Sequence, residues 1–128
     1  MAKDILALVD DLFFTTKIGA TAKNCGIPVE IVKTKEALIE KVRVGPADLI
    51  IVDLNGRTTN PVEAIQALKS DPELRSRPIL AFLSHVQVEL KERALAAGCD
   101  VVIPRSLFSQ RLAEILTEHS WTGGQSKL

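Results

Sequence analysis

Three carboxylates, one hydroxyl and one cation each come after an apolar run of strand length. Asp10 and Asp11 follow the first run, Asp53 the third, Ser84 the fourth and Arg105 the fifth. Carboxylates that share a site repel one another, so such a group is best tolerated around a hard cation such as Mg²⁺. Magnesium typically binds through one or two carboxylates together with a substrate phosphate. The pattern therefore predicts a site for phosphoryl chemistry.

The remaining polar groups fit the same chemistry. A carboxylate beside a bound cation can act as a nucleophile and form an acyl phosphate. The Ser84 hydroxyl and the Arg105 charge would then be the fixed donors around the phosphoryl oxygens. Taken singly, Asp and Ser residues at strand ends commonly cap the next helix, and Arg105 would be a surface charge. Five suitable residues after four strands favour a shared site.

Five short apolar runs alternate with segments of helical spacing, which predicts βα units. Polar residues do not alternate within the runs, as is typical of strands buried on both faces of a parallel sheet. The fold class expected is α/β, a doubly wound parallel sheet with helices on both faces. With a strand order of 2-1-3-4-5, strands one and three would be neighbours and their carboxylates would converge where the order reverses. The runs are Ile5–Val9, Val29–Val32, Leu49–Val52, Ile79–Leu83 and Val101–Ile103.

Composition limits the classes of partner. The 128 residues are 46% hydrophobic, enough for one core, so residues 1–120 are expected to form one domain and 121–128 a flexible tail. Sixteen Lys and Arg balance sixteen Asp and Glu, so there is no basic excess to bind nucleic acid directly. No apolar run approaches the ~20 residues that span a bilayer, and no membrane association is expected.

Four segments match a known family in order and spacing. They are Leu8–Asp11, Asp48–Asp53, Pro78–Ser84, and Ala97–Asp100 leading to Arg105. On these residues the chain resembles the receiver domain of bacterial two-component response regulators, in the single-domain form of the chemotaxis regulator, from Ile5 to about His119. The resemblance implies the flavodoxin-like receiver fold with five strands in the order 2-1-3-4-5. It also implies a cytoplasmic signalling phosphoacceptor, with at most self-catalysed phosphorylation and dephosphorylation, and not an enzyme in the usual sense.

The resemblance also implies roles for single residues. Asp53 would be the phosphoacceptor. Asp11, Asp53 and the backbone carbonyl of Asn55 would bind Mg²⁺, with Asp10 assisting. Ser84 would be the switch hydroxyl that turns toward the phosphoryl group.

Partners follow from the same resemblance. A sensor histidine kinase or a phosphotransfer protein would donate the phosphoryl group. A downstream protein would bind the face formed by the fourth helix, the fifth strand and the fifth helix, and a homodimer through that face is compatible with the family.

The chain departs from the family pattern on the fifth strand. Arg105 occupies the position of the family's lysine, and Ser106 follows it where the family has proline, while Pro104 precedes it. Arginine keeps the charge but offers a planar fork in place of a flexible ammonium. The family's aromatic switch residue corresponds to Val102, and the chain contains no Tyr. An aromatic switch therefore cannot operate at that position.

Two further departures lie near the acidic pocket. The loop after Asp53 reads Gly56-Arg57-Thr58-Thr59-Asn60-Pro61 and lacks the usual Met-Pro pair. His85 follows the switch hydroxyl, where the family has a small residue, and it is either a gate for the phosphoryl site or a solvent-facing residue at a helix start.

Three functions are compatible with such a sheet. The first is a receiver phosphorylated on Asp53 with Mg²⁺. The second is a degenerate receiver that binds a protein partner without phosphorylation and is indifferent to Asp53→Ala. The third, a flavin or nucleotide binder, needs a Gly-, Ser- or Thr-rich loop after the first strand. Asp10 and Asp11 stand there and repel phosphate, so the third is disfavoured.

Overall fold

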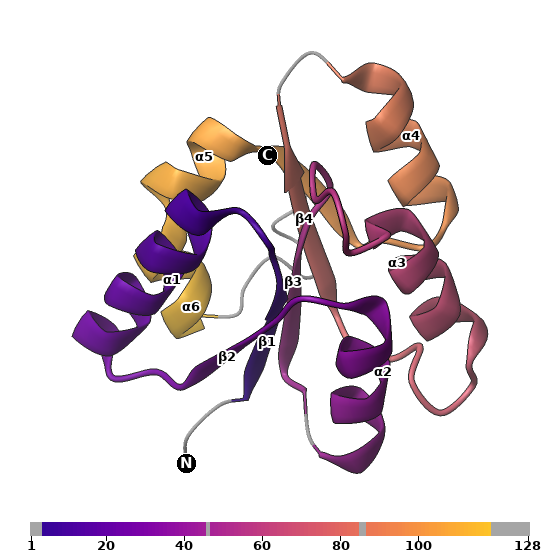
Figure 1. Cartoon of the computed structure of the whole chain (residues 1–128), viewed down its shortest axis with the longest axis horizontal. Coiled ribbons are helices and arrows are strands. Elements are labelled where there is room, and N and C mark those ends of the chain that lie inside the picture. The colour runs from indigo at the N-terminus through magenta and orange to yellow at the C-terminus, as the bar shows by residue number, and fades with distance from the viewer. Residues whose placement is uncertain (1–3, 46, 85–86, 119–128) are drawn as a thin grey trace.

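The protein is a five-stranded sheet covered by helices on both faces (Figure 1). The computed structural model describes residues 4–45, 47–84 and 87–118. The tail predicted for 121–128 and the side chain of His85 lie outside these residues. The elements are β1 Ile5–Leu8, α1 Leu12–Cys25, β2 Val29–Val32, α2 Lys35–Val44, β3 Leu49–Asp53, α3 Pro61–Ser70, β4 Ile79–Leu83, α4 Val88–Ala96, β5 Val101–Pro104, α5 Arg105–Gln110 and α6 Leu112–Glu118.

All four strand pairs are parallel, and the strand order is β2-β1-β3-β4-β5. This confirms the predicted doubly wound fold. β1 and β3 are neighbours, with Leu8 opposite Val52, so both strands end at the same edge. The strand order reverses between them, which is where open α/β sheets place their sites.

The sheet separates two hydrophobic layers. Helices α2, α3 and α4 cover one face, and α1, α5 and α6 cover the other (Figure 1). Along β1, Leu6 and Leu8 point into the first layer while Ile5 and Ala7 point into the second, as the two-residue repeat of a strand requires. Because both faces are buried, the strands read as continuous apolar runs.

The second layer contains a stack of aromatic rings. Phe82 of β4 and Phe108 of α5 lie face to face, with centroids 4.1 Å apart, and Phe14 of α1 packs 4.8 Å from Phe82. These contacts bring the start of α1 and the start of α5 together at the carboxyl end of the sheet.

The last helical region differs from the single helix expected. The backbone at Arg111 leaves helical values (φ −111°, ψ 17°) and divides the region into α5 and α6. Phe108 before the break and Leu112, Ile115 and Leu116 after it are all buried. Both segments therefore pack on the sheet despite the break.

Lys69 connects the end of α3 to the segment that leads into β4. Its ammonium donates to the backbone carbonyls of Arg75 and Arg77, each at 2.9 Å, and to Asp100 Oδ2 at 3.0 Å. The Lys69 side chain is only 15% exposed. Gly98, with φ +109°, lies against it.

None of the helices formed by the described residues is both long enough and apolar enough to cross a membrane.

Candidate functional site

Asp53 is the last residue of β3 and is only 1% exposed. Its Oδ1 accepts a 2.9 Å hydrogen bond from the backbone N–H of Asn55. Burial raises the pKa of Asp53; the Asn55 N–H and the charge of Arg105 oppose this shift, while the charges of Asp11 and Asp10 add to it. The charges of Asp10, Asp11 and Arg105 therefore act on the carboxylate of Asp53, as expected for residues predicted to share a site.

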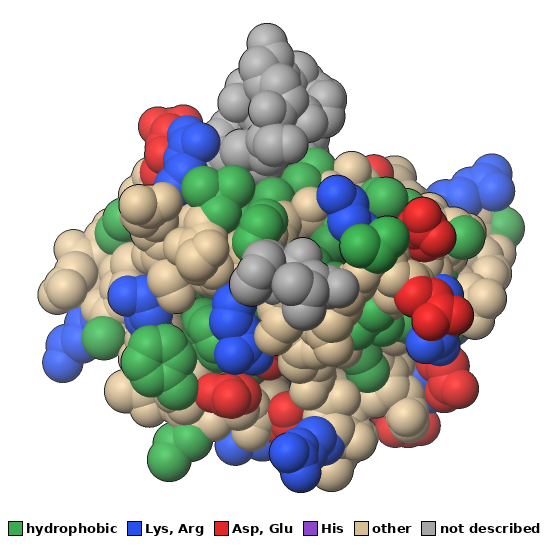
Figure 2. Space-filling model, turned by 90° about the horizontal axis from the view of Figure 1, so that it is seen from above, with side chains coloured by type: hydrophobic (Ala, Val, Ile, Leu, Met, Phe, Trp, Pro, Cys, Tyr) green, Lys and Arg blue, Asp and Glu red, His purple; other side chains and the backbone are tan. Residues whose placement is uncertain are grey.

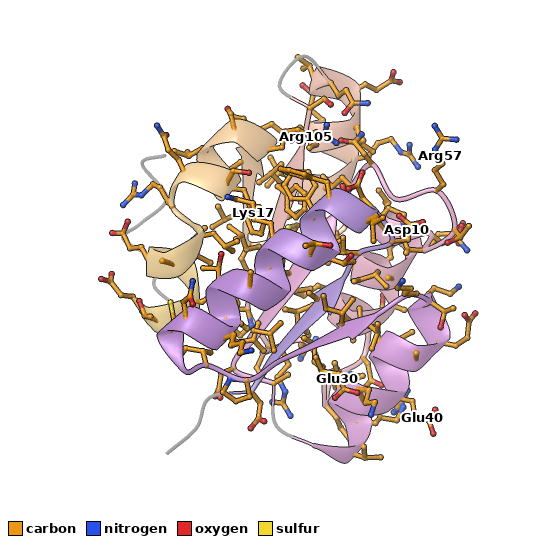
Figure 3. The ribbon with its side chains drawn as sticks, turned by 60° about the vertical axis from the view of Figure 1, so that its left-hand side comes forward. Asp10, Lys17, Glu30, Glu40, Arg57 and Arg105 are labelled. Carbon is orange, nitrogen blue, oxygen red and sulfur yellow. The ribbon has the colours of Figure 1, made fainter. Side chains whose placement is uncertain are left out.

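Asp10 reaches from the end of β1 to the loop between β3 and α3 (Figure 3). Its Oδ2 accepts hydrogen bonds from the backbone N–H of Arg57 (3.1 Å), the backbone N–H of Thr58 (3.0 Å) and the Thr58 hydroxyl (2.9 Å). Burial by itself would raise the pKa of Asp10, but the hydrogen bonds from Thr58 and Arg57 together lower it. The structure thus gives Asp10 a role in holding this loop, which sequence reasoning did not predict.

Asp11 caps helix α1. Its Oδ1 accepts a 3.1 Å hydrogen bond from the backbone N–H of Phe14, and its backbone is extended (φ −81°, ψ 125°). This is the common role of Asp before a helix. The cap engages one carboxylate oxygen, so the other can still bind a ligand.

The oxygen atoms at this edge are hard ligands of the kind that Mg²⁺ prefers. Among the described residues, however, no group of three or more His, Cys, Asp or Glu side chains is placed to hold a metal ion. With Asp10 engaged by the loop, the donors left for a cation are Asp11, Asp53 and the carbonyl of Asn55. This set fits Mg²⁺, because the ion usually binds proteins through one or two carboxylates and keeps several waters.

The Asn55 side chain links the loops that follow β3 and β4. Its Oδ1 accepts from the backbone N–H of Ser84 at 2.9 Å, and its Nδ2 donates to Gln87 Oε1 at 2.6 Å. Gln87 immediately precedes α4. A chain of contacts therefore runs from Asp53 through Asn55 to the start of α4. Sequence reasoning gave Asn55 a role only through its carbonyl, because the partner of its amide is 32 residues away.

Arg105 begins α5 and packs on an aromatic ring. Its guanidinium carbon lies 5.3 Å from the centroid of the Phe14 ring, a cation–π contact. Its Nε is buried without a hydrogen-bond partner among the described groups. Arg105 thus supplies positive charge near Asp53 while an aromatic face holds its side chain.

Val102 stands on β5, at the position to which the resemblance assigned an aromatic switch residue. A cavity of about 180 Å³ lies beside it, between β5 and the start of α4, and Val88 and Lys91 also line it. No aromatic side chain is among the described residues that line this cavity.

The face at this end of the sheet carries mixed charges. Seen from above, acidic, basic and hydrophobic side chains are interspersed, and no single charge dominates (Figure 2). Such a surface does not resemble the continuous basic patch that binds a nucleic acid backbone.

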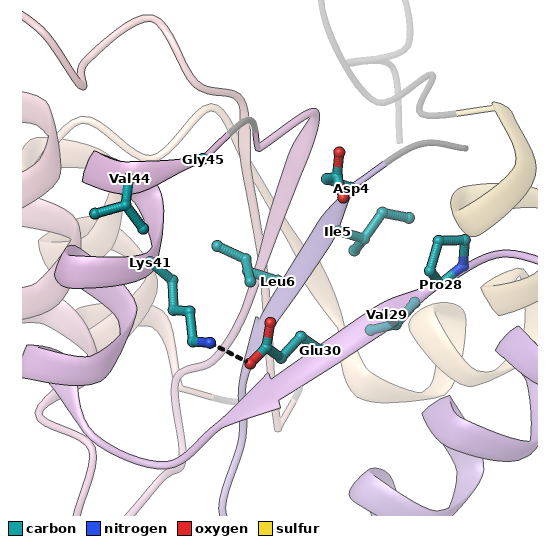
Figure 4. Close-up of a pocket in the computed structure, with 9 residues that line it drawn as sticks. All are labelled: Asp4, Ile5, Leu6, Pro28, Val29, Glu30, Lys41, Val44 and Gly45. Atoms are coloured by element: carbon teal, nitrogen blue, oxygen red, sulfur yellow. Dashed lines mark ion pairs between the residues drawn. The ribbon is translucent and has the colours of Figure 1, made fainter. Parts of the chain in front are cut away.

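A second pocket lies at the opposite end of the sheet (Figure 4). It has a volume of about 350 Å³ and is lined by the starts of β1 and β2 and the end of α2. Lys41 and Glu30 form a 2.7 Å ion pair at its wall. Because the strands end at the other edge, this pocket is not part of the site around Asp53.

Comparisons with known proteins agree with this description. No family model matches the sequence. The chain is 24% identical over 126 residues to the signal transduction histidine-protein kinase BarA of Shigella flexneri, covering 98% of the chain and 14% of the kinase. It is 26% identical over 92 residues to the polar-differentiation response regulator DivK of Brucella ovis, covering 70% of the chain and 75% of DivK. The chain thus spans only a small part of the kinase relatives.

Solved structures give the same result at the level of the fold. The phosphorylated cyanobacterial phytochrome response regulator RcpA superposes with a TM-score of 0.78 at 19% identity, over 94% of this chain and 97% of RcpA. The chemotaxis response regulator CheY4 of Vibrio cholerae superposes with a TM-score of 0.73 at 20% identity, over 91% of this chain and all of CheY4 (100%). These neighbours are response regulator receiver domains, and the chain has their fold.

Proposed function

We propose that the chain is a receiver domain of a two-component phosphorelay and that Asp53 is its phosphoacceptor. The observation that carries the proposal is the position of Asp53 at the switch point of a receiver fold, where the charges of Asp10, Asp11 and Arg105 act on its carboxylate. Paired carboxylates without a cation are electrostatically unfavourable, which argues for a ligand-binding role.

The proposed reaction uses groups already described. The Asp53 carboxylate attacks the phosphorus atom of the donor, and the bond to the leaving group breaks as the acyl phosphate forms. Asp11, Asp53 and the Asn55 carbonyl would hold Mg²⁺, with Asp10 assisting, and the bound ion supplies charge neutralisation for the phosphoryl oxygens. Arg105 and the Ser84 hydroxyl are the donors proposed for the transferred group.

Partners are proposed on the same basis. The relatives BarA and GacS are named as a histidine-protein kinase and a sensor protein, which supports a sensor kinase or phosphotransfer protein as the donor, acting in the cytoplasm. The surface of α4, β5 and α5 is proposed to bind the downstream protein or a second copy of the chain. The Asn55–Gln87 contact would connect this surface to Asp53.

Intact mass measurement tests the proposal. The protein and its Asp53→Asn variant are incubated with Mg²⁺ and acetyl phosphate, with and without a chelator. Asp48→Asn, which removes an exposed carboxylate before the start of β3, is the matched control. We expect one phosphoryl group on the wild type and on Asp48→Asn, and none on Asp53→Asn or with chelator. No gain on any protein would contradict the proposal.

A second function is favoured by one observation, the 1% exposure of Asp53. A carboxylate so buried is poorly accessible to a donor, and a degenerate receiver would bind a protein partner without phosphorylation. That function predicts no phosphoryl gain, no Mg²⁺-dependent change in thermal stability, and partner binding that Asp53→Ala leaves unchanged.

A further inference from the structure

We propose that residues 56–59, here termed the pocket latch, form a closed strap that Asp10 holds in place and that limits access to Asp53. The closed strap is a feature of the fold by itself. Its role in controlling access rests on the proposed function of Asp53 as a phosphoacceptor.

The latch is anchored by one carboxylate oxygen. Asp10 Oδ2 accepts from two successive backbone N–H groups, of Arg57 and Thr58, and from the Thr58 hydroxyl, all within 3.1 Å. Hydrogen bonds to an ionised carboxylate are stronger than those between neutral groups. The partners are 47 and 48 residues apart in sequence, so the contact joins the end of β1 to the loop that follows β3.

The rest of the latch is packed against the pocket. Thr59 is completely buried (0% exposed), whereas Thr58 is exposed. A Cβ on Gly56 would collide with the Thr59 hydroxyl and would lie 3.3 Å from the Asp53 carbonyl and 3.5 Å from Asp10 Oδ1. Only glycine fits this close approach. The latch therefore lies directly against the Asp10 side chain and the backbone of Asp53.

One feature of the closed latch is unfavourable. The Thr59 Oγ1 is buried and has no hydrogen-bond partner among the described groups. An unsatisfied buried hydroxyl costs free energy, which offsets part of the stabilisation from Asp10. Asn60, which follows, adopts the left-handed conformation (φ 49°), which is costly for a residue other than glycine. Both costs would be relieved if the loop opened.

Opening the latch would have two effects on the site. It would move the strap away from Asp10 and from the backbone of the buried Asp53. It would also free the Asp10 carboxylate, whose charge the loop donors now compensate, to assist cation binding. The closed latch thus leaves the Asp11, Asp53 and Asn55 donors in place but withholds Asp10, and opening it would widen access to the same pocket.

Thr58→Ala tests the latch, because it removes one anchor at an exposed position. Thr58→Ser retains the hydroxyl and serves as the rescue. Thr117→Ala is the matched control, since it removes an exposed hydroxyl whose hydrogen bonds among the described residues lie within α6. The first readout is amide hydrogen exchange at residues 57 and 58 without any phosphodonor. We expect exchange about three- to tenfold faster in Thr58→Ala, the factor for weakening one hydrogen bond to a charged group at an exposed site, and unchanged rates in the other two.

The second readout is the rate of phosphorylation by acetyl phosphate with Mg²⁺. The latch predicts a higher rate for Thr58→Ala than for wild type, with Thr58→Ser and Thr117→Ala equal to wild type. Equal exchange rates in Thr58→Ala and wild type would overturn the closed strap. Faster exchange with an unchanged phosphorylation rate would overturn its control of access. Faster exchange with no phosphorylation of any protein would support the strap and contradict the proposed function instead.

Discussion

Replacing Asn55 by Ala should uncouple the loops that follow β3 and β4. The variant loses the 2.9 Å hydrogen bond from the Ser84 N–H and the 2.6 Å hydrogen bond to Gln87. Ser84 is half-buried, so its orphaned N–H costs about 1–2 kcal/mol, and the lost amide contact to the more adaptable Gln87 side chain costs about 1 kcal/mol more. We therefore expect the free energy of unfolding to fall by about 2–3 kcal/mol.

Urea unfolding followed by circular dichroism measures this loss. Asn24→Ala, at an exposed position on α1, is the control and should change stability by no more than about 0.5 kcal/mol. Faster amide exchange at Ser84 in Asn55→Ala would locate the effect at the bridge. If Asn55→Ala is no more destabilising than Asn24→Ala, Asn55 does not hold the two loops together, and the proposed connection from Asp53 to α4 is wrong.

Three other substitutions, two of them paired with a control substitution, test the description of the fold and the pocket. Burial raises the pKa of Asp53 above its ordinary value of 3.8. The stability that this carboxyl group contributes to the folded state is therefore complete below pH 3.8 and is lost as pH rises through the raised pKa. Asp53→Asn should therefore be more stable than wild type at neutral pH, by a margin that shrinks as pH falls; an equal margin at all pH values would contradict this. Lys69→Met should cost about 2–4 kcal/mol in thermal unfolding, since it removes the donor of three hydrogen bonds. Lys41→Met, which breaks an exposed ion pair, should cost much less than Lys69→Met, and equal losses of stability in the two variants would contradict this. Gly98→Ala should destabilise by at least about 1 kcal/mol, because φ is +109° and the new Cβ would lie 2.8 Å from Lys69 Cγ. Gly19→Ala, in open space on α1, should instead stabilise the protein slightly. If both glycine substitutions lower the free energy of unfolding, or both raise it, the steric argument is wrong.

The fold was predictable from the sequence because its signals are local. The five apolar runs have strand length and lack alternation, which is the pattern of strands buried on both faces, and the structure has a strand in each of them. The position of Asp53 at the end of β3 follows from the run before it. The resemblance to receiver domains gave the strand order, which the structure confirms.

The break at Arg111 was not predictable by the same reasoning. Apolar residues continue at helical spacing on both sides of it, so the periodicity suggests one helix where the structure has two. The backbone there departs from helical values at a single residue, and the 3.6-residue spacing of apolar residues is too coarse to reveal such a change.

Local patterns were enough to place the polar residue types at the carboxyl edge of the sheet, since each of them follows its own strand. The contacts that these side chains make became visible in the folded chain. Asp10 bonds to a loop 47 and 48 residues away, Asn55 reaches Gln87 across 32 residues, and Arg105 packs on Phe14. Such pairings depend on where separate loops meet after the chain has folded, so they cannot be predicted from the spacing of residues within one segment.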